Sequence, residues 1–319
     1  MSPSQDAITT HGWRLELIRR CADLAPVATA VAHPCDEAAL GAAVEAAIHG
    51  LIIPILVGPQ AKIRAAAEAI GADISGYRLE PTPHSHASAA RAVALVAAGE
   101  AQLLMKGSLH TDELMHEVMN AATGLRTARR ISHVYIMDVP RYPRPLMISD
   151  AAINIAPTLE DKQSIVQNAI DLAHVLGEAR PRVAILSAVE TINPKLQSTL
   201  DAAALCKMAD RGQITGGLLD GPLAFDNAIS LEAAKEKHIV SSVAGKADIV
   251  IVPDLISGNI LAKQLTFLAG ADAAGVVVGA RVPIILTSRA DPETARISSC
   301  AVAVLMAHHA QTAAPQVKA

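Results

Sequence analysis

An apolar run at residues 283–287 ends at a serine and an arginine, Ser288 and Arg289. The planar guanidinium of an arginine can bind a phosphate through two parallel hydrogen bonds, and a serine hydroxyl can donate to a sulfur or an oxyanion. Asp291 and Glu293 follow within helical reach and could accept a proton. The same residues could also form only a capping turn, and local chemistry alone slightly favours that simpler interpretation.

A second candidate segment, residues 103–112, has the pattern of a strand end followed by a helix start. Lys106 supplies a positive charge, and Gly107 would let the backbone approach a ligand closely. Ser108 and Thr111 offer hydroxyl groups, and the amides that open the next helix would face an anion. A surface turn with Thr111 as an ordinary cap explains the pattern equally well. The segment is not a Walker loop, because G-x-x-x-x-G-K-[ST] does not occur in this sequence.

Paired glycines and an Asp-Gly-Pro triplet mark a third segment, residues 216–228. The glycines are expected to enter a strand and the triplet to leave it in a tight turn. Asp220 and Asp226 could orient a base or a hydroxyl group. Local chemistry favours the simpler view that both aspartates form turns or caps.

In a fourth segment, residues 252–263, a strand ends at Pro-Asp and a Ser-Gly-Asn corner follows, before a helix. The amides of the corner could receive a phosphate or a carbonyl oxygen. Asp254 is explained equally well as a helix cap. The candidate ligands of the segment are Asp254, Ser257, Gly258, Asn259 and Lys263.

Short β-branched runs alternate with longer stretches rich in alanine and leucine, which predicts βαβ units and a mainly parallel sheet. Most of the runs are continuously apolar, as expected for strands that are covered on both faces. The predicted strands are residues 27–31, 51–57, 102–105, 133–138, 146–149, 182–186, 249–252, 275–278 and 283–287. The predicted helices include residues 36–49, 60–70, 85–98, 161–176 and 292–307.

The ends of these helices carry recognisable signals. Asp36 and Asp161 stand where helix N-caps are expected. Glycines stand where the helices should stop, namely Gly50, Gly71, Gly99 and Gly177. Three prolines between residues 139 and 145 separate two predicted strands and indicate a hairpin-like excursion near a domain junction.

Composition excludes several classes of function. The chain has 319 residues, of which 51% are hydrophobic and 2% aromatic, and its net charge is -4. Few aromatic side chains and no net positive charge argue against a nucleic-acid partner. Four scattered cysteines and a polar N-terminus without an apolar core segment indicate a cytoplasmic protein with reduced thiols and no membrane partner. The histidine spacing indicates no metal site, and G-x-S-x-G and G-x-G-x-x-G signatures are absent.

Taken together, the segments resemble the phosphate acetyl/butyryltransferase family, most closely its phosphate butyryltransferases and the acyltransferase part of enoyl-CoA hydratase/phosphate acetyltransferase fusions. The resemblance is strong from about residue 101 to 307 and looser before that. It rests on five segments in the same order: residues 104–111, 124–127 with 131–133, 220–230, 253–263 and 286–291.

The resemblance implies an α/β protein of two α/β/α domains like the isocitrate and isopropylmalate dehydrogenases, with mainly parallel sheets and an active-site cleft between them. The first domain would comprise residues 1–133 and 279–319 and the second residues 134–278. It further implies a homodimer that needs neither metal nor cofactor and converts acyl-CoA and phosphate into acyl phosphate and CoA through a ternary complex.

The resemblance assigns thiol or oxyanion hydrogen bonding to Ser288 and transition-state charge stabilisation to Arg289. Acetyl-specific members have an aspartate proposed as thiol base near the position of Ala295, so here Asp291 or Glu293 would replace it, or no such base exists. Those members also have an arginine where this chain has Met115 and His116. Phosphate binding would then rest on Lys106, Ser108 and Arg126.

Two alternatives belong to other classes. A decarboxylating dehydrogenase of the same fold would need metal-binding carboxylates and a nicotinamide, and would produce NADH from a 2-hydroxy acid. A non-catalytic acyl-CoA-binding protein would bind CoA without turnover, and Ser288→Ala would leave its affinity largely intact.

Overall fold

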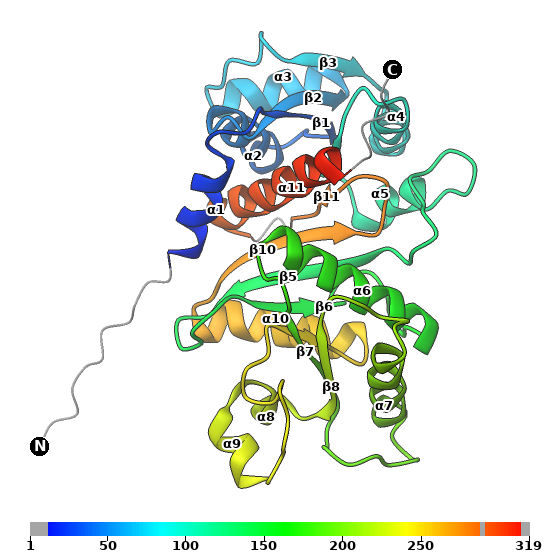
Figure 1. Ribbon diagram of the computed structural model, residues 1–319. Coiled ribbons are helices and arrows are strands. Elements are labelled where there is room, and N and C mark those ends of the chain that lie inside the picture. Colours follow the sequence, from blue (N-terminus) through cyan, green and yellow to red (C-terminus); the bar gives the residue numbers. More distant parts are fainter. Residues whose placement is uncertain (1–11, 288–290, 314–319) are drawn as a thin grey trace, which may run out of the picture. The chain divides into compact units, whose positions relative to one another are not determined.

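The computed structural model describes residues 12–287 and 291–313 (Figure 1). Its chain divides into two compact units. The described part of the first unit comprises residues 17–134, 175–177, 274–287 and 291–313, and that of the second comprises residues 12–16, 135–174 and 178–273. Within the described residues, we find no helix that combines the length and the apolarity needed to cross a membrane.

The sheet of the first unit has the strand order β3-β2-β1-β4-β11-β10. Its strands are β1 (Val27–Ala32), β2 (Ile52–Gly58), β3 (Arg78–Pro81), β4 (Leu103–Lys106), β10 (Asp272–Val278) and β11 (Ile284–Ile285). All neighbouring pairs from β3 to β11 are parallel, and only the β10–β11 pair is antiparallel among those of this sheet. The parallel strands therefore end at the same edge of the sheet.

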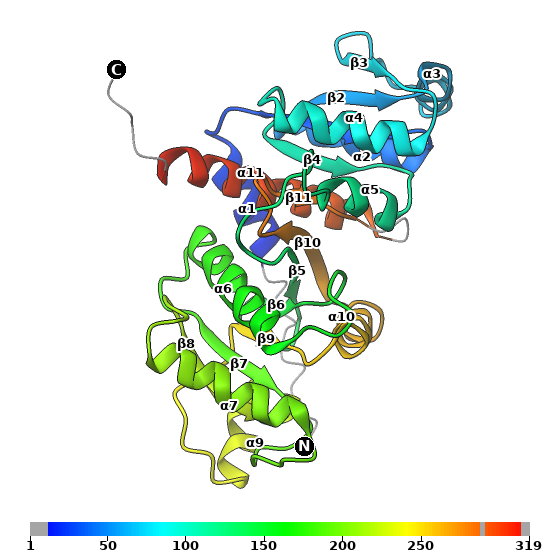
Figure 2. The same cartoon turned by 90° about the vertical axis from the view of Figure 1, so that its right-hand side faces the viewer.

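Helices cover both faces of this sheet, as Figure 2 shows. They are α2 (Glu37–Ile48), α3 (Gln60–Ala69), α4 (Ser85–Ala97), α5 (Thr111–Val118) and α11 (Glu293–Ala313), while α1 (Trp13–Cys21) belongs to this unit from Leu17 onward. Helix α4 packs beside α5, and α2 packs against α3 and α11. Burial on both faces explains why β1, β2 and β4 are mostly apolar in sequence.

The second unit repeats the layered arrangement around the strand order β5-β6-β9-β7-β8. Its strands are β5 (Ser132–Asp138), β6 (Leu146–Ser149), β7 (Arg182–Leu186), β8 (Leu218–Leu223) and β9 (Ile249–Ile251). Its helices are α6 (Leu159–Val175), α7 (Gln197–Asp210), α8 (Phe225–Ile229), α9 (Leu231–Glu236) and α10 (Leu255–Ala269). Strands β6, β9, β7 and β8 pair in parallel, and β5 and β6 are neighbours joined through the proline-rich loop, as the hairpin prediction requires.

The α/β class with mainly parallel sheets is confirmed, and so are several helix ends. Gly50, Gly71, Gly99 and Gly177 all have positive φ after their helices, a conformation that glycine adopts without strain. Asp36 caps α2 by accepting a 2.8 Å hydrogen bond from the amide of Ala39.

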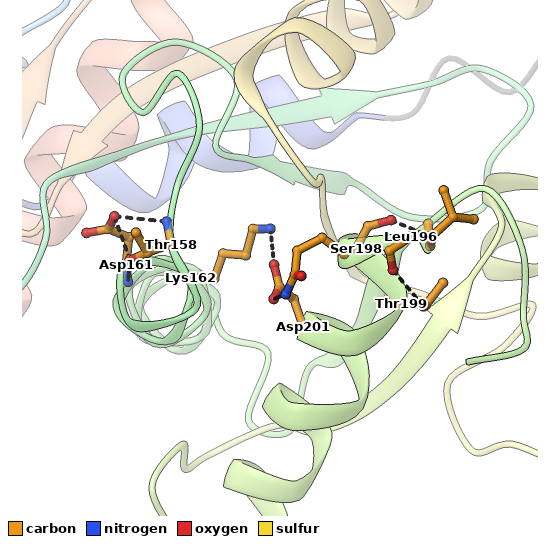
Figure 3. Close-up of polar contacts among 9 residues, drawn as sticks. Thr158, Asp161, Lys162, Leu196, Ser198, Thr199 and Asp201 are labelled. Atoms are coloured by element: carbon orange, nitrogen blue, oxygen red, sulfur yellow. Dashed lines mark hydrogen bonds and ion pairs between the residues drawn. The ribbon is translucent and has the colours of Figure 1, made fainter. Parts of the chain in front are cut away.

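In the second unit, one cap prediction and one turn prediction are wrong. Asp161 is not the N-cap of α6, because Thr158 precedes that helix and exchanges hydrogen bonds of 3.0 and 3.2 Å with Asp161 in a capping box (Figure 3). The Asp-Gly-Pro triplet does not leave its strand either. It lies inside β8, where Asp220 and Gly221 pass so close to β7 that a Cβ atom on Gly221 would lie 2.7 Å from the carbonyl oxygen of Ile185.

A buried ion pair connects α6 to α7 inside the second unit (Figure 3). Nζ of Lys162 lies 2.6 Å from Oδ2 of Asp201, and each side chain is only 7% exposed. The second carboxylate oxygen of Asp201 accepts a 2.8 Å hydrogen bond from the side-chain amide of Gln197. Both oxygens are thus satisfied, which is the condition under which a charge can remain buried.

Candidate active site

A pocket lies in the first unit at the carboxyl ends of β4 and β11. Its empty volume is about 310 Å³, open solvent at its mouth included. The lining comes from residues 105–108 at the end of β4 and just after it, Thr287 after β11, the first turns of α2 with Asp36, and Arg296 of α11. The carboxyl edge of an open parallel sheet is where α/β proteins bind their ligands, so this position favours a binding site.

Lys106 brings a positive charge into the pocket from the last position of β4. The residue is 9% exposed, and its ammonium donates to the carbonyl oxygens of Gly107 at 3.3 Å and Leu109 at 3.2 Å. These contacts hold the cation against the turn that follows β4. Because a cation with little water around it interacts strongly with an anion, Lys106 favours a negatively charged ligand.

The backbone of Gly107 passes very close to the end of β1. Gly107 donates its amide to the carbonyl oxygen of Ala32 at 2.8 Å. A Cβ atom at this position would lie 2.4 Å from that oxygen and 2.5 Å from the carbonyl oxygen of His33. The glycine is therefore required for two strand ends to meet beneath the pocket.

We expect Gly107→Ala to destabilise the first unit by about 1–3 kcal/mol, because the added methyl group would push two backbone segments apart. Urea unfolding followed by circular dichroism would measure the change. Gly76→Ala is a matched control, since nothing lies within 4 Å of a Cβ atom there. Equal unfolding midpoints for the two variants would contradict the prediction.

Ser108 uses its hydroxyl to fix backbone. Its Oγ donates to the carbonyl oxygen of His33 at 2.8 Å and accepts from the amide of Cys35 at 3.2 Å. The hydroxyl proton is therefore engaged within the chain, and Ser108 shapes the pocket that it lines. Thr111 is the first residue of α5 and His110 occupies the N-cap position, so the interpretation of Thr111 as a cap is wrong.

Arg296 is a pocket residue that the sequence analysis missed. Its Nη1 donates to the carbonyl oxygen of Ala38 at 3.1 Å, which joins α11 to the first turn of α2. Asp36 was predicted only as a cap, yet it also lines the pocket. No local sequence signal pointed to Arg296, because this residue reaches the pocket through the packing of the first turn of α11 against α2.

Ser288 and Arg289 lie outside the described residues. Thr287, which precedes them, lines the pocket, and Asp291 is half-buried just before α11. Arg126 is exposed and does not belong to the pocket lining. Its backbone instead forms a β-bridge with Ala280.

The two aspartates of the third segment belong to the second unit. Asp220 accepts a 2.8 Å hydrogen bond from the amide of Gly221. Asp226 stands at the start of α8 and pairs with Lys237 at 3.0 Å, a contact that lowers the pKa of the Asp226 carboxyl. Lys237 also binds Glu190, whose pKa it lowers in the same way. In this structure Asp226 thus connects α8 to the end of α9.

The fourth segment also lies in the second unit, where Asp254 is the N-cap of α10. Its Oδ1 accepts from the amide of Ser257 at 2.9 Å, and its carbonyl oxygen accepts from the amide of Gly258 at 3.2 Å. Asn259 donates its side-chain amide to the carbonyl oxygen of Ala151 at 3.2 Å. The corner is therefore the first turn of a helix with engaged amides, while Lys263 on the same helix is exposed.

A Cβ atom on Gly258 would lie 2.7 Å from the Val252 side chain and 3.0 Å from the carbonyl oxygen of Asp150. The loop that follows Asp150 is held in place by the buried carboxylate of that residue. Its oxygens accept from the amides of Ala152 at 2.9 Å and Ile153 at 3.1 Å. Burial raises the pKa of Asp150. Gly258 thus serves the packing of α10 against this loop.

The chain is similar to known proteins of one family. The family model described as phosphate acetyl/butaryl transferase matches residues 84–304. A phosphate acetyltransferase of Rhizobium meliloti is 64% identical over 295 residues, which cover 92% of this chain and 93% of the relative. A phosphate butyryltransferase of Clostridium acetobutylicum is 42% identical over 285 residues, with 89% and 94% covered.

A solved structure, that of a branched-chain phosphotransacylase from Enterococcus faecalis V583, is 30% identical with a TM-score of 0.77. The match covers 88% of this chain and 99% of that one. The family match spans more than half of the chain, and the relatives match it over nearly their whole length. The chain therefore belongs to the phosphate acetyl/butyryltransferase family.

Proposed function

We propose that this protein transfers a short acyl group between coenzyme A and inorganic phosphate, according to acyl-CoA + phosphate ⇌ acyl phosphate + CoA. The observation that carries the proposal is the pocket at the ends of β4 and β11. There Lys106, Arg296 and the first turn of α2 line one pocket together with Thr287, the residue that precedes Ser288 in the sequence. Two cations and a helix N-terminus favour a small anion such as phosphate.

In the proposed reaction, an oxygen of the bound phosphate attacks the thioester carbonyl carbon, and the tetrahedral intermediate expels the CoA thiolate. Lys106, Arg289 and Arg296 neutralise the phosphate, which would otherwise be repelled by Asp36 in the same pocket. The carboxylate of Asp36 is directed to the α2 amide of Ala39. Ser288 donates a hydrogen bond to the oxyanion or the leaving sulfur. Asp291 donates a proton to the leaving thiolate, and in the reverse direction it accepts the proton of the CoA thiol.

The other residues predicted to bind substrate fall into two groups, one in each unit. Gly107 and Ser108 shape the phosphate pocket, and Thr111 and Arg126 stand outside its lining. In the second unit, Asp220, Asp226 and the α10 residues 254–263 remain candidates for binding CoA. Of these, Lys263 has the chemistry that suits the phosphates of that substrate, because its side chain is exposed and carries an ammonium group. The proposed enzyme uses no metal or cofactor and forms a homodimer.

Release of CoA thiol from acyl-CoAs of two to five carbons, with and without inorganic phosphate, tests the proposal. We expect release to require phosphate and the acyl phosphate to appear in equal amount. NADH formation from a 2-hydroxy acid would indicate the dehydrogenase alternative. CoA binding without turnover would indicate the acyl-CoA-binding alternative, and either result would overturn the proposed reaction.

A further inference from the structure

His33 follows β1 and has a left-handed backbone conformation, with φ at 59°. Residues with a Cβ atom adopt this conformation at a cost, and such outliers persist where the surroundings hold them in place. The amide of His33 still donates to the carbonyl oxygen of Val57 at 2.7 Å, so the residue continues the pairing of β1 with β2. The left-handed turn therefore redirects the chain at the very end of the sheet.

This turn aims the carbonyl oxygen of His33 at two segments that line the pocket. The oxygen accepts from the amide of Ser108 at 2.9 Å and from its hydroxyl at 2.8 Å. It also accepts from the amide of Cys35 at 2.9 Å, in the loop that leads to α2. One peptide group thus fixes both the turn after β4 and the entry to α2.

The imidazole ring of His33 is what secures the turn. Its Nδ1 lies 3.0 Å from Oγ of Ser88, a fully buried residue of α4. The Ser88 hydroxyl donates to the carbonyl oxygen of His84 at 2.9 Å, so its proton is already used. With that proton directed to His84, Oγ of Ser88 can accept a hydrogen bond from Nδ1–H of His33 and another from the hydroxyl of Thr82, which lies 2.8 Å away.

We propose that His33 is a positioning residue for the phosphate pocket. Its ring, anchored on Ser88, holds a left-handed backbone turn whose carbonyl oxygen fixes the segment with Lys106 and Ser108. The inference rests on the proposed function, because it assigns phosphate as the ligand that this segment binds. His33 acts through the backbone of the pocket and needs no contact with phosphate.

The variants that test this role separate the ring from the backbone. His33→Gly tolerates the left-handed conformation but removes the anchor, so we expect the KM for phosphate to rise about 10-fold or more, since small misplacements in a site are costly. His33→Asn should stay within about threefold of the wild type, because asparagine also tolerates positive φ and places an N–H donor near the position of Nδ1. Ser88→Ala should resemble His33→Gly.

Controls distinguish positioning from a loss of folded protein. His238 is also left-handed, with φ at 55°, but it is exposed on the second unit, so His238→Gly should leave the KM unchanged. A loss of folded protein lowers kcat and leaves KM as it was. The double variant of His33→Gly and Ser88→Ala should have the same phosphate KM as Ser88→Ala alone, because both changes remove the contact between His33 and Ser88.

An unchanged phosphate KM in His33→Gly, with phosphate-dependent release intact in the wild type, would overturn the inference. Amide hydrogen exchange gives a second readout that needs no activity. The amides of Gly107 and Ser108 donate to Ala32 and His33, and their protection should fall at least about 10-fold in His33→Gly and persist in His33→Asn. If the wild type releases CoA without phosphate, the proposed function fails, and exchange alone decides the positioning role. Equal protection in all variants would reject it.

Discussion

In Arg289→Ala, we expect kcat for phosphate-dependent CoA release to fall by about 10²- to 10³-fold, while the KM for acyl-CoA changes little. The guanidinium would stabilise the charge that develops as phosphate attacks the thioester. An interaction that strengthens in the transition state changes kcat more than ground-state binding. Initial rates of thiol release at saturating phosphate and acyl-CoA would measure the effect.

Two further arginine variants sharpen this test. Arg289→Lys retains the charge but loses the planar fork, so its kcat should lie between those of the wild type and Arg289→Ala. Arg281 is an exposed arginine of the same unit outside the pocket lining, and Arg281→Ala should keep the wild-type kcat. Full turnover in Arg289→Ala would remove Arg289 from the proposed mechanism.

Much of the scaffold could be predicted because its signals are local. Strand β7 was predicted with its observed bounds, because an arginine and four apolar residues lie between two turn segments and fit only one short buried strand. Gly50 and Gly99 stop their helices because positive φ favours glycine whatever the surroundings. The short β3 at the edge of its sheet was not predicted, because its sequence RLEP contains charges and a proline.

The misplaced Asp-Gly-Pro turn has a tertiary cause. Such a triplet usually forms a turn, but β8 pairs in parallel with β7, and Gly221 fits tightly against Ile185. Close packing against a neighbouring strand therefore outweighed the local preference. The capping box of α6 is a subtler case, in which Thr158 and Asp161 both satisfy backbone amides and the sequence analysis chose the wrong partner as cap.

The candidate site divides in the same way. The segment with Lys106 was found from the sequence because glycine and hydroxyl residues follow an apolar strand. The contacts that give Gly107 and Ser108 their roles come from Ala32 at the end of β1 and from His33 after it, more than 70 residues earlier in the chain. Arg296 enters the pocket through the packing of α11 against α2, and no local pattern reports such a contact. Site residues at strand ends could thus be predicted from the sequence, whereas a residue that reaches the pocket through helix packing could not.

We expect Asp201→Ala to lower the free energy of unfolding of the second unit by about 3–5 kcal/mol. The variant leaves the ammonium of Lys162 in a buried site without the carboxylate that lies 2.6 Å away in the wild type (Figure 3). Gln197 loses its acceptor in the same substitution, which adds an unsatisfied amide. Urea titration followed by circular dichroism would measure the loss.

The same helix provides a matched control, because Asp210 pairs with Lys207 on the exposed side of α7. An exposed pair is screened by water, so Asp210→Ala should leave the unfolding midpoint unchanged. Replacing both buried partners, as Lys162→Met with Asp201→Leu, should recover most of the stability, because no charge is then stranded in the core. If Asp201→Ala and Asp210→Ala had the same unfolding midpoint, the buried pair would stabilise the fold no more than the exposed pair does. If the double replacement were as unstable as Asp201→Ala, the loss would come from packing between α6 and α7 rather than from a buried charge.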